Sequence, residues 1–154
     1  MGKYVRHIVI LLAAMMLSLG ASAQIQKDFF NGCVMGVSTK KQVSKIMQKQ
    51  GYERNGEYKK GIAFNYVNFA GVSWDRVEMY FENDVLYTVI FLKYEHPEEN
   101  LIVAGNAMKV MYPKTNIHYD DKDNTIQASD DRMNMQMYIK DGVLNAGFSY
   151  IFLR

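Results

Sequence analysis

Cysteine, proline and histidine are scarce in this sequence, with one, two and three copies among 154 residues. Because Cys33 is the one cysteine, no disulfide can form within the chain. Cys33 sits between Phe30 and Met35 in an apolar stretch, which favours a buried thiol over a reactive one. Residues 24–154 contain two histidines, His96 and His118, and no motif joins either of them to Cys33 as a general base.

Motifs of the common enzyme classes are also missing. There is no glycine-rich phosphate loop and no H-E-x-x-H, C-x-x-C or G-x-S-x-G motif. The aspartates of residues 120–124 lack the sixth-position glycine and the twelfth-position glutamate of a calcium loop. The methionines are more typical of core packing than of metal binding. We therefore predict that the protein is not an enzyme and has no catalytic residue, cofactor or metal site. Carboxylates that the fold brings together are the catalytic alternative.

No block of like charge occurs along the chain. The formal net charge is +2, and Lys3 and Arg6 account for all of it, because residues 1–23 contain no acid. The rest of the chain is neutral overall and carries no basic block. We therefore predict no nucleic-acid partner, and nothing in this composition favours an anionic membrane surface.

The N-terminal segment 1–23 has the pattern of a secretory signal peptide. Lys3 and Arg6 precede an apolar run over residues 8–19, and Ala21-Ser22-Ala23 fits a cleavage site. The run is short for a membrane span, although an uncleaved anchor is the alternative. We predict cleavage after Ala23, a periplasmic or secreted location, and a single α+β domain over residues 24–154.

A predicted β-hairpin over residues 74–93 organises the rest of the chain. Asn83-Asp84 suits a two-residue turn with positive φ at both positions. This turn predicts a core face made of Val77, Met79, Phe81, Leu86, Thr88 and Ile90. The alternate positions form the opposite, outer face, with Trp74, Arg76, Glu78, Tyr80, Tyr87, Val89 and Phe91.

A similar hairpin follows 58 positions later. Residues 79–86 and 137–144 share four of eight residues. In this second hairpin, the core face is predicted to hold Met133, Met135, Met137, Ile139, Leu144, Ala146, Phe148 and Tyr150. The opposite face is predicted to show Asn134, Gln136, Tyr138 and Asn145.

Each hairpin follows a predicted helix. The first begins at Ser38-Thr39, where Thr39 and Gln42 have capping-box spacing, and ends at Gly51. The second begins at Pro97 and stops at Pro113. This order predicts two tandem helix-plus-antiparallel-sheet units, residues 36–94 and 95–154, with the helices packed on one face of the sheet. Chance similarity between two hairpins is the alternative.

The stretch Gly36-Val37-Ser38-Thr39-Lys40-Lys41-Gln42-Val43, followed by Gly51-Tyr52, resembles the opening of small secreted bacterial domains of the SmpA/OmlA and β-lactamase-inhibitor-like type. The resemblance implies a helix followed by an antiparallel sheet whose concave face binds partners. Two features depart from it. Those inhibitors contain disulfides, and the outer-membrane assembly members are lipoproteins, whereas Phe30-Asn31-Gly32 before Cys33 is no lipobox. We therefore extend the architecture to this chain, but not the inhibitory or assembly role.

These observations predict a non-catalytic periplasmic or secreted binding module. Its partner is predicted to be a protein in the cell envelope or outside the cell, bound through outer-face side chains of the types enriched at interfaces. Those residues are Trp74, Arg76, Tyr80, Tyr87, Phe91 and Tyr138. Three alternatives stay open: the aromatics only stabilise the sheet, the face forms a homodimer, or the protein carries a lipid or peptide in an internal apolar cavity.

Overall fold

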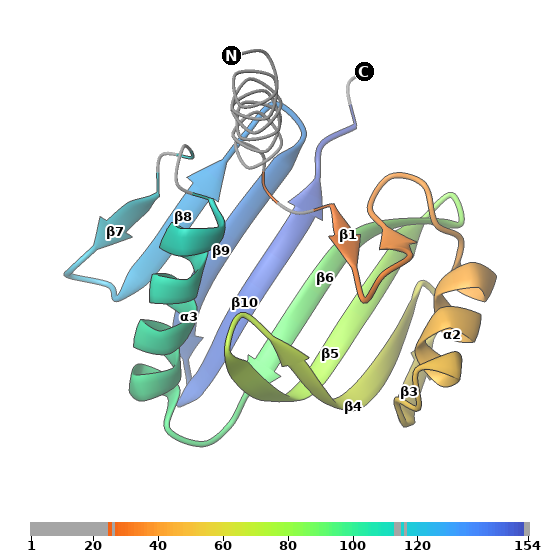
Figure 1. Ribbon diagram of the computed structural model, residues 1–154, viewed down its shortest axis with the longest axis horizontal. Coiled ribbons are helices and arrows are strands. Elements are labelled where there is room, and N and C mark those ends of the chain that lie inside the picture. The colour runs from red at the N-terminus through yellow and green to blue at the C-terminus, as the bar shows by residue number, and fades with distance from the viewer. Residues whose placement is uncertain (1–24, 26, 113–114, 116, 153–154) are drawn as a thin grey trace, which may run out of the picture.

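A continuous eight-stranded antiparallel sheet dominates the computed structural model, which describes residues 25, 27–112, 115 and 117–152 (Figure 1). Its strands lie side by side in the order β3-β4-β5-β6-β10-β9-β8-β7. The predicted signal peptide, residues 1–23, lies outside the described residues. The strands are β3 (Arg54–Tyr58), β4 (Gly61–Phe69), β5 (Val72–Glu82), β6 (Val85–Lys93), β7 (His118–Asp120), β8 (Thr125–Ser129), β9 (Met133–Lys140) and β10 (Val143–Tyr150).

One face of this sheet is covered by two helices and a small hairpin. The helices are α2 (Lys40–Lys49) and α3 (Pro97–Met111), and β1 (Asp28–Phe29) pairs with β2 (Cys33–Val34) in a separate two-stranded sheet. Figure 1 shows α3, the β1–β2 hairpin and α2 in front of the same face, with the hairpin between the helices. No described helix has the length and apolar character needed to cross a membrane.

The two helix starts follow the sequence signals. The Thr39 side chain accepts a hydrogen bond from the backbone N–H of Gln42, and the Gln42 side chain accepts one from that of Thr39. This confirms the predicted capping box. Pro97 occupies the first turn of α3 and is followed by Glu98 and Glu99. Negative carboxylates near the positive end of the helix dipole stabilise the helix.

The predicted α+β fold of two tandem helix-plus-sheet units is wrong. The protein is mostly β, with one eight-stranded sheet, one two-stranded sheet and two helices among the described residues. The residues Leu144 to Ser149 of β10 pair with Lys93 to Thr88 of β6 without a break. Each of these strands would otherwise expose a row of unpaired backbone N–H and C=O groups. Their pairing joins all eight strands into a single sheet.

The β5–β6 hairpin has the predicted turn but a different register. Asn83 and Asp84 have φ values of 49° and 62°, and Phe81 lies opposite Leu86. Beyond this pair the register shifts by one residue, because Tyr87 is an extra residue on β6. Val89 therefore lies opposite Met79, and not Thr88 as predicted. The bulge exchanges the two faces of β6.

Two predicted outer-face residues of β6, Val89 and Phe91, are consequently buried in the core. Thr88 and Ile90, which were predicted to be core residues, lie on the opposite face and are half-buried. They pair with Ser149 and Gly147 of β10.

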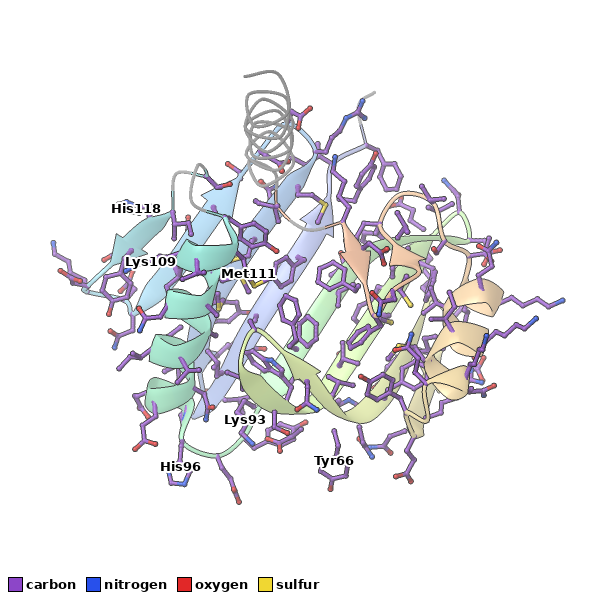
Figure 2. The ribbon with its side chains drawn as sticks, in the orientation of Figure 1. Tyr66, Lys93, His96, Lys109, Met111 and His118 are labelled. Carbon is purple, nitrogen blue, oxygen red and sulfur yellow. The ribbon has the colours of Figure 1, made fainter. Side chains whose placement is uncertain are left out.

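A bend in the β4–β5 hairpin places Trp74 in the core as well, against the prediction. Tyr66 has a φ of 51°, a left-handed conformation that breaks the straight course of β4. Figure 1 shows the β4–β5 connection curling in front of the sheet, and Figure 2 shows the Tyr66 side chain pointing away from it. Trp74 has no exposed surface, and its Nε1–H donates to the carbonyl oxygen of Phe69 at 2.9 Å.

The core lies between the sheet and its covering layer, and aromatic rings fill its centre. Phe69 stacks on Phe91 with ring centroids 4.6 Å apart, and Phe29 meets Phe148 edge to face at 5.0 Å. The β1–β2 hairpin supplies Phe29 and the buried Cys33. The predicted core residues of the second hairpin are confirmed as buried at Met133, Met135, Met137, Leu144, Ala146 and Phe148, while Ile139 and Tyr150 are half-buried and pack against the core.

Candidate binding site on the outer sheet face

The outer face is the face of the eight-stranded sheet turned away from α2, α3 and the β1–β2 hairpin. Among the described residues it carries side chains of the strands themselves, because the described covering elements lie on the other face (Figure 1). Alternation along each strand decides which side chains reach it. The backbone pairing then aligns them in rows across the strands.

The outer face divides into a charged part and an uncharged part. Arg76 and Glu78 on β5 are its charged residues nearest to β6. From β6 across β10 and β9 to β8, the exposed Lys140 lies at the end of β9, and the other outer-face side chains around Gly147 are amides, hydroxyls, one tyrosine and two aliphatic groups. They are Thr88, Ile90, Leu92, Asn145, Ser149, Asn134, Gln136, Tyr138, Gln127 and Ser129, with Gly147 among them.

A hollow of about 310 Å³ lies in this uncharged part, and we call it the Gly147 hollow. Gly147 pairs with Gln136 of β9 on one side and with Ile90 of β6 on the other. Because glycine has no side chain, its position forms a low point between these neighbours. The hollow is lined by Thr88, Ile90, Asn134, Gln136, Tyr138, Asn145, Gly147 and Ser149.

Packing does not require a glycine at position 147. The pairing of β10 with both neighbours is unbroken there, so Gly147 forms no bulge, and its φ is not positive. A Cβ atom added at this position would come no closer than 3.9 Å to another atom, the carbonyl oxygen of Gln136. A glycine inside a strand weakens the strand, and it often marks a place where a ligand approaches the backbone.

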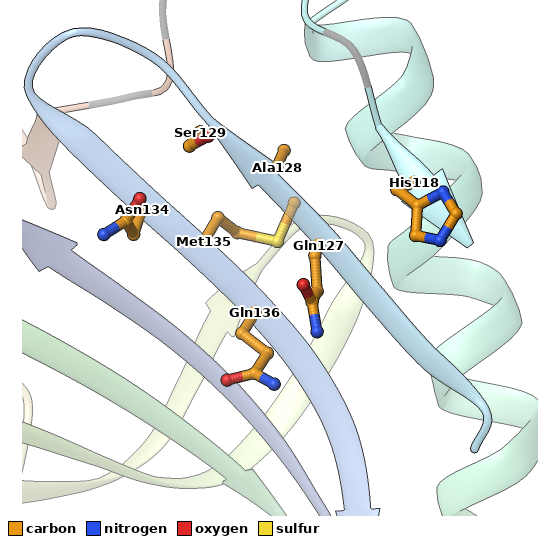
Figure 3. A pocket seen from close by; sticks show the side chains of 7 residues that line it. All are labelled: His118, Gln127, Ala128, Ser129, Asn134, Met135 and Gln136. Atoms are coloured by element: carbon orange, nitrogen blue, oxygen red, sulfur yellow. The ribbon is translucent and has the colours of Figure 1, made fainter. Parts of the chain in front are cut away.

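A second hollow of about 450 Å³ adjoins the first, and we call it the His118 hollow (Figure 3). Its lining residues come from β7, β8 and β9: His118, Gln127, Ala128, Ser129, Asn134, Met135 and Gln136. Asn134 and Gln136 line both hollows. Gln127 lies directly opposite Gln136 in the backbone register.

The amides of the His118 hollow are available to a ligand. Gln127, Asn134 and Gln136 are exposed, and none of the three side chains forms a hydrogen bond with another described residue. Each amide offers two N–H donors and a carbonyl acceptor. These three amides therefore present donors and acceptors in the same place without a formal charge.

Two predicted binding residues, Arg76 and Tyr80, instead form a cluster with Glu78 and Tyr58. The Nε–H of Arg76 donates to Glu78 Oε1 at 2.8 Å, and the Tyr80 hydroxyl donates to Glu78 Oε2 at 2.6 Å. Arg76 also donates to the Tyr58 hydroxyl, and the Tyr58 and Tyr80 rings stack at 6.2 Å. Burial and the adjacent Glu78 carboxylate raise the pKa of Tyr80 well above its usual range. These groups already bind one another.

The other four predicted residues have different positions. Tyr138 lines the Gly147 hollow, and Tyr87 is half-buried at the β6 bulge. Trp74 and Phe91 are fully buried, so they are not available at the surface. Asn134, Gln136 and Asn145 lie on the face that alternation predicted for them, but they were not predicted to be part of the site. The sequence signal that would have identified this site is Gly147, a glycine in the middle of a strand with polar outer-face residues on both sides.

Other reactive groups do not gather in the described structure. Burial, reinforced by the charge of Asp28, raises the pKa of the Cys33 thiol to about 12, so the thiol is protonated at neutral pH and is a poor nucleophile. Within the described ranges, no three His, Cys, Asp or Glu side chains come together in a group that could hold a metal ion.

No protein-family model, curated protein or solved structure matches this chain. The resemblance of residues 36–52 to the SmpA/OmlA and β-lactamase-inhibitor-like domains therefore stays a prediction.

Proposed function

We propose that this protein is a non-catalytic binding module, acting in the periplasm or outside the cell, that holds its ligand on the outer sheet face. The observation that carries the proposal is the pair of adjoining hollows, which share Asn134 and Gln136 and are lined mainly by uncharged polar side chains. Binding sites typically combine a concave surface with a few convergent polar groups.

The rigidity of the sheet supports this assignment. The lining residues of the Gly147 hollow belong to three neighbouring strands, β6, β10 and β9, which are hydrogen-bonded along their length. The backbone that carries these groups is already ordered by its pairing, so no binding free energy is spent on ordering it when a ligand arrives.

The carrier alternative has less support. The centre of the described core is filled by mutually packed rings such as Phe69, Phe91 and Phe148. An apolar hollow of about 210 Å³ lies between α3 and strands β7 and β8, but Asn106 and Lys109 are among its lining residues. That hollow is smaller than either of those on the outer face.

A co-sedimentation assay tests the proposal. The exported protein is mixed with washed cell envelopes from the cells that produce it, and the bound fraction is measured after centrifugation. The double variant Asn134→Ala, Gln136→Ala removes the amides shared by both hollows. The double variant Gln48→Ala, Asn68→Ala removes two exposed amides that line neither hollow.

We expect the wild type and the control variant to sediment with the envelopes, and the outer-face variant to bind about tenfold more weakly. Circular dichroism checks that all three proteins are folded. Equal sedimentation of the two double variants, or no sedimentation of the wild type, would contradict the proposal.

A further inference from the structure

We infer that the ligand of the outer face is a neutral, polyhydroxylated chain, that is, a saccharide, rather than a protein. This inference rests on the proposed function and specifies the chemistry of the same site. It depends on the side chains that line the Gly147 and His118 hollows, on the missing side chain at Gly147 and on the distribution of charge.

The lining groups complement hydroxyls. A sugar hydroxyl both donates and accepts hydrogen bonds, and a side-chain amide does the same through separate atoms. The Gly147 hollow offers the amides of Asn134 and Gln136, which form no hydrogen bond with another described residue. It also offers the remaining amide groups of Asn145, whose Nδ2 donates to the Val143 carbonyl at 3.0 Å, and the hydroxyls of Thr88 and Ser149, which form one hydrogen bond with each other at 3.4 Å. Tyr138 and Ile90 add apolar surface for the C–H groups of a sugar ring.

The distribution of charge disfavours an ionic ligand. No charged side chain lines the Gly147 hollow. Arg76 and Glu78 on β5 form an ion pair at 2.8 Å, so neither is left to neutralise a ligand, and the exposed Lys140 at the end of β9 is not among the lining residues. An ionised group entering the hollow would lose water without gaining a counter-charge, which is unfavourable.

The surface also fits a protein partner poorly. Protein-binding patches centre on large apolar or aromatic anchors, whereas the two most apolar predicted anchors, Trp74 and Phe91, are in the core. An extended peptide that adds to a sheet pairs with the backbone of an edge strand, but the Gly147 hollow lies over β6, β10 and β9 in the interior of the sheet.

The extent of the site indicates a chain rather than a single sugar. The two hollows adjoin and together run from β6 across β10, β9 and β8 to β7. Neighbouring strands lie about 4.8 Å apart, so these four steps cover roughly 19 Å. We therefore expect an oligosaccharide or polysaccharide to lie across the strands.

Gly147→Val is the variant that tests this inference most directly. A valine fills the low point of the hollow, yet its Cβ has room and β-branched residues favour strands. We expect its urea unfolding midpoint to equal or exceed that of the wild type. Ser73→Val adds the same side chain at an exposed position of β5 that lines neither hollow, and it serves as the matched control.

The experiment measures co-sedimentation of the wild type, Gly147→Val and Ser73→Val with three envelope preparations: untreated, protease-treated, and oxidised with periodate, which cleaves vicinal diols. We expect the wild type and Ser73→Val to bind untreated and protease-treated envelopes and to lose binding after periodate. Gly147→Val should bind untreated and protease-treated envelopes about tenfold more weakly than the wild type. Binding by the wild type should change little in 0.5 M NaCl, because a neutral ligand leaves no ion pairs to screen.

The outcomes separate the inference from the proposed function. Binding that is lost after protease but not after periodate, or that falls steeply with salt, would overturn the saccharide assignment. If Gly147→Val still bound more weakly than Ser73→Val in that case, the outer face would remain the binding site. Equal binding by folded Gly147→Val and Ser73→Val would overturn both.

Discussion

Trp74 and Tyr80 lie on the same strand, yet they belong to different environments. Trp74 is fully buried, contacts Phe91 and donates a hydrogen bond to Phe69. Tyr80 is half-buried on the outer face, where it stacks on Tyr58. The bend at Tyr66 is what separates the two environments.

We therefore expect Trp74→Ala to lower the free energy of unfolding by about 3–5 kcal/mol, the usual cost of deleting a large buried aromatic side chain. Tyr80→Ala should cost about 1–2 kcal/mol, because it removes one hydrogen bond to a charged group and a partly exposed ring contact. Urea denaturation followed by circular dichroism measures both. A larger loss for Tyr80→Ala than for Trp74→Ala would contradict the observed burial.

The buried thiol of Cys33 makes the stability of the folded protein depend on pH. Its pKa is raised from 9.0 to about 12 by burial and by Asp28, so the unfolded chain loses this proton at a lower pH than the folded protein. The stability contributed by the neutral thiol is fully present below about pH 9 and is lost as the pH rises towards about 12.

The test compares the wild type with Cys33→Ala by urea denaturation at several pH values between about 8 and 10.5. We expect the stability of the wild type relative to the variant to fall as the pH rises. We also expect the native thiol to react slowly with a thiol reagent at about pH 8 and rapidly after unfolding. A pH-independent difference in stability, with rapid native labelling, would show that the thiol is accessible.

At the scale of elements, the start of α2 depends on one side chain. Thr39 and Gln42 satisfy each other's backbone N–H groups, and the helix has only ten residues. We expect Thr39→Ala to lower the free energy of unfolding by about 1 kcal/mol, the typical cost of removing an N-cap. Lys41→Ala, at an exposed position of the same helix, is the control and should stay within about 0.5 kcal/mol of the wild type. Equal effects would mean that the cap contributes nothing measurable.

At the scale of the whole molecule, the junction between β6 and β10 decides the cooperativity of folding. The unbroken pairing of these strands and a single core cluster connect β3–β6 with β7–β10. We therefore expect one cooperative unfolding transition. Trp74 fluorescence reports on β5, and far-ultraviolet circular dichroism reports on all strands. Coincident curves in urea would agree with this expectation, whereas two separated transitions would contradict it.

The sequence by itself determined the local features of this protein. Turn chemistry predicted the Asn83-Asp84 hairpin, capping chemistry predicted the start of α2, and alternation predicted the core face of β9. All of these depend on residues close together in the chain, and their backbone conformations are as expected. The assignment of Asn134, Gln136 and Asn145 to the face opposite the core follows from the same alternation.

Only the tertiary structure decided the sheet and the site. One extra residue, Tyr87, exchanges the faces of β6, and the left-handed Tyr66 bends β4 and β5 over the core. Each change is local, but it reverses the side of the sheet on which nearby residues lie: Val89 and Phe91 on β6, and Trp74 on β5. The pairing of β6 with β10 joins distant segments, and the Gly147 hollow exists because that pairing places Ile90 and Gln136 on either side of a glycine. Alternation fixes neither a bulge nor a long-range partner, because both depend on which backbone groups of two strands pair with each other.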